Sequence, residues 1–270
     1  MKRHKICKII FAILAVFLCV AFYELIGICV TYKKQPAVSD ATIKETQNIM
    51  SVAGRENTER AVIIEKNSQA LLERVRLIQN AKDEIILSTF AFKSDESGKL
   101  ILGALHDAAD RGVHVRILVD GMESWIDMEG NPYFYGLSSH ENVEIKLYNK
   151  ANPLKPWKTM GRMHDKYLIA DGKIYILGGR NTYNYFLGDF PGHKNFDRDV
   201  LVVCDEPQKD NSVNQLWNYF ETIWEQEDCR YFHNSKKLAD RQSVKKAVLE
   251  LQEGYQQYLS LIHISEPTRH

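Results

Sequence analysis

An α/β fold behind an N-terminal membrane-spanning helix is the architecture that the sequence predicts. Short runs of β-branched and aromatic residues alternate with segments whose apolar residues recur at helical spacing, between about residues 61 and 229. Two of the short runs are joined by Asp171-Gly172, which is a strong signal for a two-residue hairpin. Near the N-terminus, an apolar segment is long enough to cross a bilayer.

The apolar segment runs from Ile9 to Val30 and is interrupted only by Glu24, which we expect to snorkel near the outer end. The basic residues before it are Lys2, Arg3, Lys5 and Lys8, and those after it are Lys33 and Lys34. This bias places the N-terminus in the cytoplasm and the rest of the chain outside. Residues 1–34 are therefore expected to be an anchor. A cleaved signal peptide is the alternative, but the apolar core is long and no clean A-x-A site follows.

Residues 35–60 are polar without strong periodicity and are expected to form a stalk. The lobe then begins near Ala61. A helix end and a buried strand are expected within residues 81–92, followed by a helix over 97–112 that stops at a glycine. Residues 113–120 complete a strand, helix, strand order.

The second half of the lobe contains the hairpin, a strand and a helix. The hairpin strands are Lys166–Ala170 and Lys173–Leu177, and the next strand lies within residues 196–203. A helix over 213–224 carries one apolar stripe, which we assign to the core and not to a lipid-binding face. The stripe consists of Val213, Leu216, Trp217, Phe220, Ile223 and Trp224.

The residues around the hairpin suit phosphoryl transfer. Side chains alternate along a strand, so His164 and Lys166 should face one ligand while Asp165 faces away. A neutral imidazole can attack phosphorus and form a phosphohistidine, and Lys166 can neutralise the phosphate oxygens. Gly178-Gly179 would let the backbone approach the anion, and Asn181 offers an amide donor. This chemistry requires no metal, and no cofactor is expected.

The spacing His164-x-Lys166-x4-Asp171-x6-Gly178-Gly179-x-Asn181 resembles the signature of the phospholipase D superfamily. Many members of the superfamily have Ser at the position of Gly179. The sequence Gly-Gly-Arg-Asn resembles the corresponding motif of the bacterial cardiolipin-synthase-like members. The resemblance covers about residues 61–229. It implies a lobe of parallel and antiparallel strands in one sheet, with helices on both faces.

The resemblance assigns catalysis to His164, Lys166 and Asp171, and phosphate binding to Gly178, Gly179, Arg180 and Asn181. For Asp171, the Asp-Gly turn provides an equally good structural reason. These seven residues are the predicted site.

A phospholipase D site needs two such motifs facing each other, because one histidine is the nucleophile and the other moves the proton. No lysine lies two residues after any of five other histidines, which are His106, His114, His140, His193 and His233. The second lobe is expected beyond this chain, or a second copy completes the site.

The C-terminal residues 259–270 match the frame translation of a transposase sequencing adapter. We therefore expect the authentic chain to stop near Tyr258, with residues 61–232 as the lobe and 233–258 as the start of a connector between lobes. This fragment alone is expected to be inactive.

The formal net charge is zero, without the basic excess common in nucleic-acid enzymes. Basic residues near the motif form a local patch suited to anionic headgroups, although an ordinary solvated face fits equally well. They are Lys150, Lys155, Lys158, Arg162 and Lys173. Cys204 and Cys229 follow the anchor and could pair outside the cytoplasm, but the sequence does not show whether they meet.

The leading hypothesis is a membrane-anchored phosphatidyltransferase that transfers a phosphatidyl group to a phosphatidylglycerol-like acceptor. A hydrolytic phospholipase D would use water as the acceptor. The rival classes are a dimeric endonuclease of the superfamily and a noncatalytic membrane scaffold; nucleic acid is the less favoured partner.

Overall fold

The computed structural model describes residues 2–33, 39–44, 59–150, 152, 154–205 and 211–265. The chain divides into two compact units. The first comprises residues 1–57 and 151–161, and the second comprises residues 58–150 and 162–270. Residues 151–161 lie inside the sequence range of the predicted lobe but fall in the first unit.

The N-terminal unit contains α1 (Lys2–Lys33) and a short 3₁₀ helix, η1 (Pro156–Met160). Within α1, the length and composition of His4–Val30 are those of a helix that can cross a membrane. Most of the predicted stalk lies outside the described residues, apart from a helical turn over 40–44 and the start of the first strand.

The lobe is built on an eight-stranded mixed sheet, which confirms the predicted fold class. The order across the sheet is β1-β7-β6-β5-β2-β3-β4-β8, in which β2, β3 and β4 are parallel and all other neighbours are antiparallel. The strands are β1 (Glu59–Ile64), β2 (Glu84–Thr89), β3 (His114–Asp120), β4 (Val143–Tyr148), β5 (Tyr167–Ala170), β6 (Ile174–Gly178), β7 (Asp199–Cys204) and β8 (Cys229–Tyr231).

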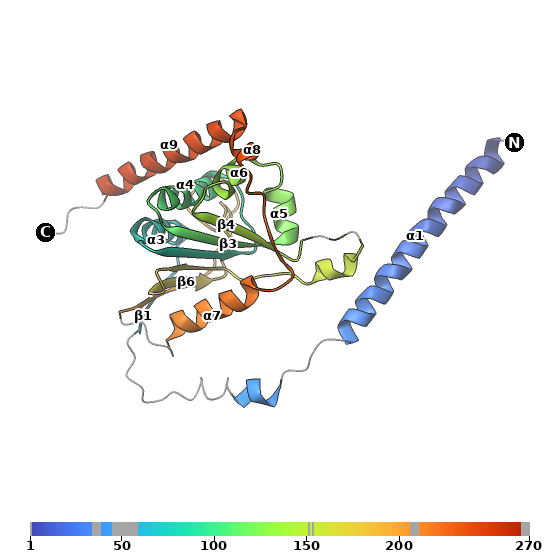
Figure 1. The fold of residues 1–270 in the computed structure, drawn as a ribbon, viewed down its shortest axis with the longest axis horizontal. Helices are drawn as coiled ribbons and strands as arrows, with labels where there is room; N and C mark the ends of the chain where they lie inside the picture. Colours follow the sequence, from blue (N-terminus) through green and yellow to red (C-terminus); the bar gives the residue numbers. More distant parts are fainter. Residues whose placement is uncertain are drawn as a thin grey trace. The chain divides into compact units, whose positions relative to one another are not determined.

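Helices cover both faces of the sheet (Figure 1). One apolar core lies under α3 (Asn67–Asn80), α4 (Glu96–Asp110) and α6 (Pro132–Ser138). The opposite core lies under α7 (Ser212–Trp224), where Val213, Phe220 and Trp224 are buried. The stripe predicted for this helix therefore packs as core. The short α5 (Gly121–Asp127) directly follows β3.

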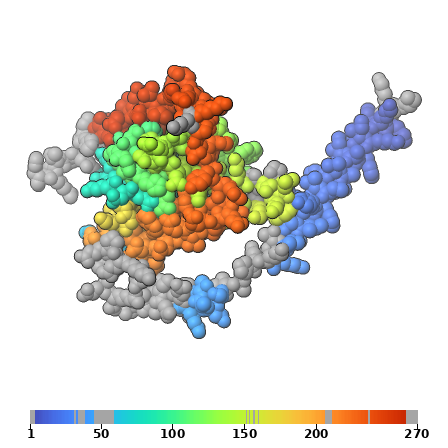
Figure 2. All heavy atoms as spheres, in the orientation of Figure 1, coloured from blue at the N-terminus to red at the C-terminus, as the bar shows by residue number. Residues whose placement is uncertain are grey.

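The segment that we expected to begin a connector is instead part of the lobe. After α8 (Lys236–Ala239), α9 (Gln242–Ser265) packs against α4 and α6, as the red spheres over green ones show (Figure 2). Its Leu251 and Tyr255 are buried in the larger core. Gly103 of α4 permits this close approach, because a Cβ there would lie 2.7 Å from the carbonyl oxygen of Leu251. Helix α9 continues past Tyr258, and residues 266–270 of the suspected adapter translation lie outside the described residues.

The boundaries of the other strands and helices of the lobe differ from expectation by one to three residues. Hydrogen-bond pairing, which composition does not reveal, sets these boundaries. For example, β7 begins at Asp199, and β5 begins at Tyr167, which pairs with Ser88. Cys204 and Cys229 are both buried free thiols. Burial raises the pKa of Cys229 to about 11.

Candidate active site

His164 lies in the extended segment that leads into β5, at the sheet edge where β2 ends. Its side chain is exposed, and its imidazole packs edge-on against Phe90, with 4.5 Å between ring centroids. Phe90 is the residue after β2. An accessible imidazole held by one aromatic contact can present a ring nitrogen to a bound phosphodiester.

Lys166 has the opposite environment, because its side chain is buried and the residue is 6% exposed. Its Nζ donates a hydrogen bond to the carbonyl oxygen of His164 at 2.6 Å. Desolvation lowers the pKa of Lys166, while the charges of Asp165 and Asp197 act against that shift. A partly desolvated ammonium next to His164 is a strong electrostatic partner for an anion that enters the site.

The expected alternation along a strand does not describe how these two residues meet. Both precede β5, and Lys166 folds back onto the backbone of His164. Its Nζ also lies 5.4 Å from the Phe90 ring centre. Phe90 thus lies beside both predicted catalytic groups. This role of Phe90 was not predicted. The only sequence signal was an aromatic residue directly after a buried strand.

Asn181 joins the same group through the residue after Phe90. Its Oδ1 accepts a hydrogen bond from the backbone N–H of Ala91 at 3.2 Å, and the side chain is buried. His164 and Lys166 therefore both lie against Phe90, and Asn181 binds the backbone of the neighbouring Ala91. These three residues were the core of the predicted site.

Asp120 holds the backbone that carries His164 and was also missed. Its carboxylate, 1% exposed, accepts hydrogen bonds from the N–H of Met163 at 3.1 Å and from Nε of Arg162 at 2.9 Å. Asp120 ends β3, and the guanidinium of Arg162 lies over Phe90 at 4.9 Å. The hydrogen bond to Asp120 raises the pKa of Arg162 despite desolvation. A buried carboxylate at a strand end could have been noted as a candidate from sequence.

Gly178 and Gly179 make room for carboxylates of the chain itself. A Cβ on Gly178 would clash with Asp199, and one on Gly179 would clash with Asp197. The two glycines thus pack closely against residues 197–199 at the start of β7, whereas the sequence suggested that they let an anion approach. Asp197 in turn contributes to the field at Lys166.

Arg180 does not reach the site. It is 1% exposed and forms a 3.2 Å ion pair with Asp199, while its guanidinium donates to Oδ1 of Asn67 at 3.1 Å. It also donates to the carbonyl oxygens of Ile64 and Glu65. Arg74 donates to the same Asp199 at 2.9 Å. Arg180 thus ties β7 to the segment after β1, which corrects its assignment to phosphate binding.

Asp171 lies at the opposite end of β5 from His164, about 16 Å along the strand direction from Lys166. Its carboxylate accepts hydrogen bonds from the backbone N–H groups of Lys82, Asp83 and Glu84, and its φ is 52°. The structure therefore separates Asp171 from the predicted catalytic pair and gives it a structural role at the turn.

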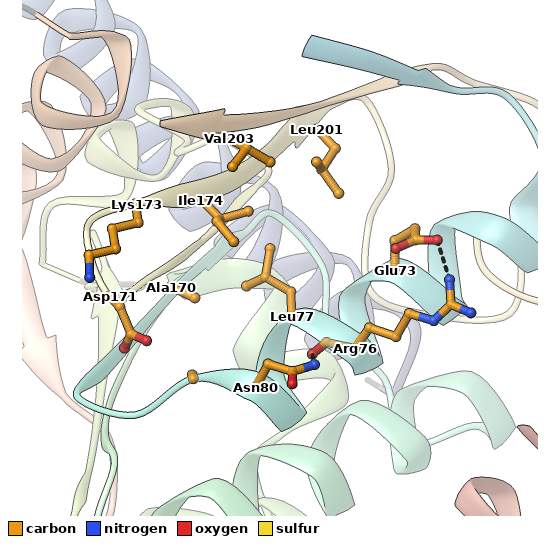
Figure 3. A pocket seen from close by; sticks show the side chains of 11 residues that line it. Glu73, Arg76, Leu77, Asn80, Ala170, Asp171, Lys173, Ile174, Leu201 and Val203 are labelled. Atoms are coloured by element: carbon orange, nitrogen blue, oxygen red, sulfur yellow. Dashed lines mark hydrogen bonds and ion pairs between the residues drawn. The ribbon is translucent and has the colours of Figure 1, made fainter. Parts of the chain in front are cut away.

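Asp171 and Lys173 instead border a cavity of about 290 Å³ between α3 and the hairpin (Figure 3). The walls are largely apolar, with Leu77, Ile174 and Leu201 among them. Lys173 thus stands away from His164, and Arg162 is neutralised by Asp120 and Glu123. Lys173 and Arg162, two members of the predicted basic patch, therefore do not form one free basic surface beside His164.

The profile of the family described as "Cardiolipin synthase, PLD-like domain" matches residues 75–224, more than half of the chain. This chain belongs to that family. The match contains His164, Lys166 and Asn181, together with the strands and helices that place them. The predicted relationship to cardiolipin-synthase-like members of the phospholipase D superfamily is thereby confirmed.

Relatives agree with this membership. The chain is 33% identical over 181 residues to an uncharacterized protein of Helicobacter pylori (strain ATCC 700392 / 26695), covering 62% of this chain and 35% of the relative. It is 29% identical over 154 residues to cardiolipin synthase C of Escherichia coli (strain K12), covering 52% and 31%. The chain therefore spans about a third of the length of these relatives.

Solved structures support the fold. NucT from Helicobacter pylori superposes with a TM-score of 0.51 at 17% identity, covering 64% of this chain and 99% of NucT. The phosphatidylserine synthase of Haemophilus influenzae Rd KW20 superposes with a TM-score of 0.51 at 15% identity, covering 81% and 48%. At these identities the likeness concerns the fold alone.

Proposed function

We propose that this chain is one catalytic lobe of a membrane-anchored phosphatidyltransferase of the cardiolipin-synthase kind. The observation that carries the proposal is the exposed imidazole of His164, with the buried ammonium of Lys166 bonded to its carbonyl oxygen. The family match and the named cardiolipin synthases among the relatives support the lipid substrate.

In the proposed reaction, a ring nitrogen of His164 attacks the phosphorus of a phosphatidylglycerol donor. The bond from phosphorus to the glycerol headgroup breaks, and the departing oxygen takes a proton from a general acid. The primary hydroxyl of a second phosphatidylglycerol then attacks the phosphohistidine and returns its proton to that group. Two phosphatidylglycerol molecules give one cardiolipin and one glycerol, and His164 is regenerated.

The charges around His164 suit the phosphoryl group in this scheme. The Lys166 ammonium would stabilise the negative oxygens, and the Asn181 amide nitrogen would donate to another. One histidine cannot both carry the phosphoryl group and move the proton. We therefore infer that a second lobe, in the rest of a longer protein or in a second copy, supplies the acid, and that the 270-residue chain alone turns over little.

Helix α1 is proposed as the anchor, with its N-terminus in the cytoplasm and the lobe outside. Its apolar window and the basic residues that precede it support this orientation. The lobe would then meet phospholipid headgroups at the outer surface of the membrane.

The test uses the full-length protein encoded at the source locus, incubated with phosphatidylglycerol vesicles, with products read by mass spectrometry. We expect cardiolipin and glycerol from the wild type, and none from His164→Ala. The matched control is His114→Gln, because His114 is also partly exposed but lies at the other end of the sheet.

Cardiolipin formation that survives in His164→Ala would refute the catalytic assignment. Phosphatidate in place of cardiolipin would identify a hydrolytic phospholipase D. Cleavage of DNA without any lipid product would identify an endonuclease, and a lack of all three products would favour a scaffold.

A further inference from the structure

The segment just before the catalytic histidine packs on the outer end of α1. Residues 151–161 lie in the same compact unit as α1, although they connect β4 to the His164 segment. The Tyr23 hydroxyl donates to the carbonyl oxygen of Leu154 at 2.9 Å, and the rings of Tyr23 and Trp157 meet edge-on at 5.0 Å. The Trp157 ring covers Gly27, which is buried. Any side chain at this position would collide with the ring.

This contact has a definite depth along the apolar helix. The apolar window ends at Val30, so Gly27 lies about 4 Å and Tyr23 about 10 Å inside that end. Membrane proteins concentrate Trp and Tyr at this level, where a ring is apolar on its body and polar at its tip. Trp157 and Tyr23 therefore occupy the depth of an aromatic belt.

The rest of the segment has the composition of an interface. Leu154 is 78% exposed and Met160 is 76% exposed, so the segment presents two large apolar side chains on its surface. Lys155 and Lys158 are exposed between them. Apolar side chains interleaved with lysines suit the boundary between acyl chains and anionic headgroups, where each type finds its preferred surroundings.

We propose that residues 154–160 form an interfacial segment that lies in the headgroup layer of an anionic phospholipid membrane, against the outer end of α1. The proposal rests on α1 being the anchor. It adds that the part of the chain just before the His164 segment binds the headgroup layer. His164 follows Gly161 by three residues, so chain length alone keeps it within about 10 Å of the segment.

The first experiment measures whether Trp157 contacts lipid. The 270-residue chain is reconstituted into vesicles of phosphatidylglycerol and phosphatidylcholine, with and without bromine on the acyl chains near the headgroup. Brominated lipid should quench the tryptophan emission of the wild type. Trp157→Phe should remove more than half of the quenched emission, while Trp125→Phe should not, because Trp125 is an exposed tryptophan of α5 in the lobe.

A second pair of variants tests the contact with α1. Gly27→Leu places a side chain where the Trp157 ring lies. It should change the quenching of the Trp157 emission by brominated lipid at least twofold. Ala21→Leu introduces the same side chain at an exposed position of the same helix and should leave the quenching unchanged.

Extraction with alkaline carbonate separates this proposal from the anchor itself. A chain that carbonate releases from the vesicles overturns both. A chain that stays in the membrane, but whose quenching is the same with and without Trp157, overturns the interfacial segment alone. In that case a soluble partner or a second copy would cover Leu154 and Met160.

Discussion

The ammonium of Lys166 is hydrogen-bonded to the carbonyl oxygen of His164 at 2.6 Å, so the two predicted catalytic residues are linked through the backbone of one of them. The imidazole stays exposed while the ammonium is buried. A cation fixed in this way does not need to reorganise when a phosphate arrives, which is the condition for strong electrostatic stabilisation. Its protonation state is therefore central to the proposed activity.

Asp197→Asn should move the alkaline limit of activity to lower pH. Desolvation already places the pKa of Lys166 below its usual value, and the charges of Asp165 and Asp197 counteract this. Removal of one charge leaves desolvation less opposed, so the ammonium loses its proton at a lower pH. The measurement is kcat/KM against pH for the full-length enzyme. Asp205→Asn, in an exposed ion pair with Arg60, should leave the profile unchanged; an unmoved limit in Asp197→Asn would contradict the prediction.

Gly179→Ser should destabilise the lobe. A Cβ at this position clashes with the Asp197 carboxylate, and overpacking of this kind costs about 1–3 kcal/mol. Asp197→Gly in the same chain should recover most of the loss, with a coupling above about 0.5 kcal/mol in urea unfolding. Gly254→Ser is the control, since a Cβ there meets nothing within 4 Å. Strict additivity would show that the two positions do not conflict.

Asp199→Asn should lower the free energy of unfolding by about 3–5 kcal/mol, because it leaves Arg74 and Arg180 buried without their counter-charge. Glu65→Gln breaks a solvent-exposed ion pair with Arg198 and should cost about 1 kcal/mol or less. Both are measured by denaturant unfolding of the detergent-solubilised chain. Equal effects of the two variants would argue against a buried arginine cluster.

Asp171 should behave as a structural residue. Asp171→Ala removes the acceptor of three backbone N–H groups at a left-handed position, and should cost about 1–3 kcal/mol. Asp171→Asn should be milder, because Asn tolerates positive φ and keeps one oxygen. In the full-length enzyme, kcat of the folded Asp171→Asn protein should stay within about tenfold of wild type, whereas a loss like that of His164→Ala would restore Asp171 to the catalytic group.

Much of the fold follows from local patterns. The Asp-Gly hairpin, the apolar stripe of α7 and the apolar length of α1 are each contained in a short stretch, where alternation or helical spacing shows which side is buried. The strict spacing of His164, Lys166 and Asn181 identified the family. Side-chain direction at His164 and Lys166 was less predictable, because the pairing of β5 begins only at Tyr167.

Tertiary structure decided the roles that depend on distant partners. The sequence does not distinguish Arg180 from an arginine that binds phosphate. In the structure Arg180 is buried and binds Asn67, which lies 113 positions away. Asp171 meets Lys82 across 89 positions, and Trp157 meets Tyr23 of α1. The sequence alone predicted the elements, the candidate anchor and the candidate reactive group. Burial and charge pairing are properties of the assembled chain, because the energy of a charged group depends on which groups replace its water.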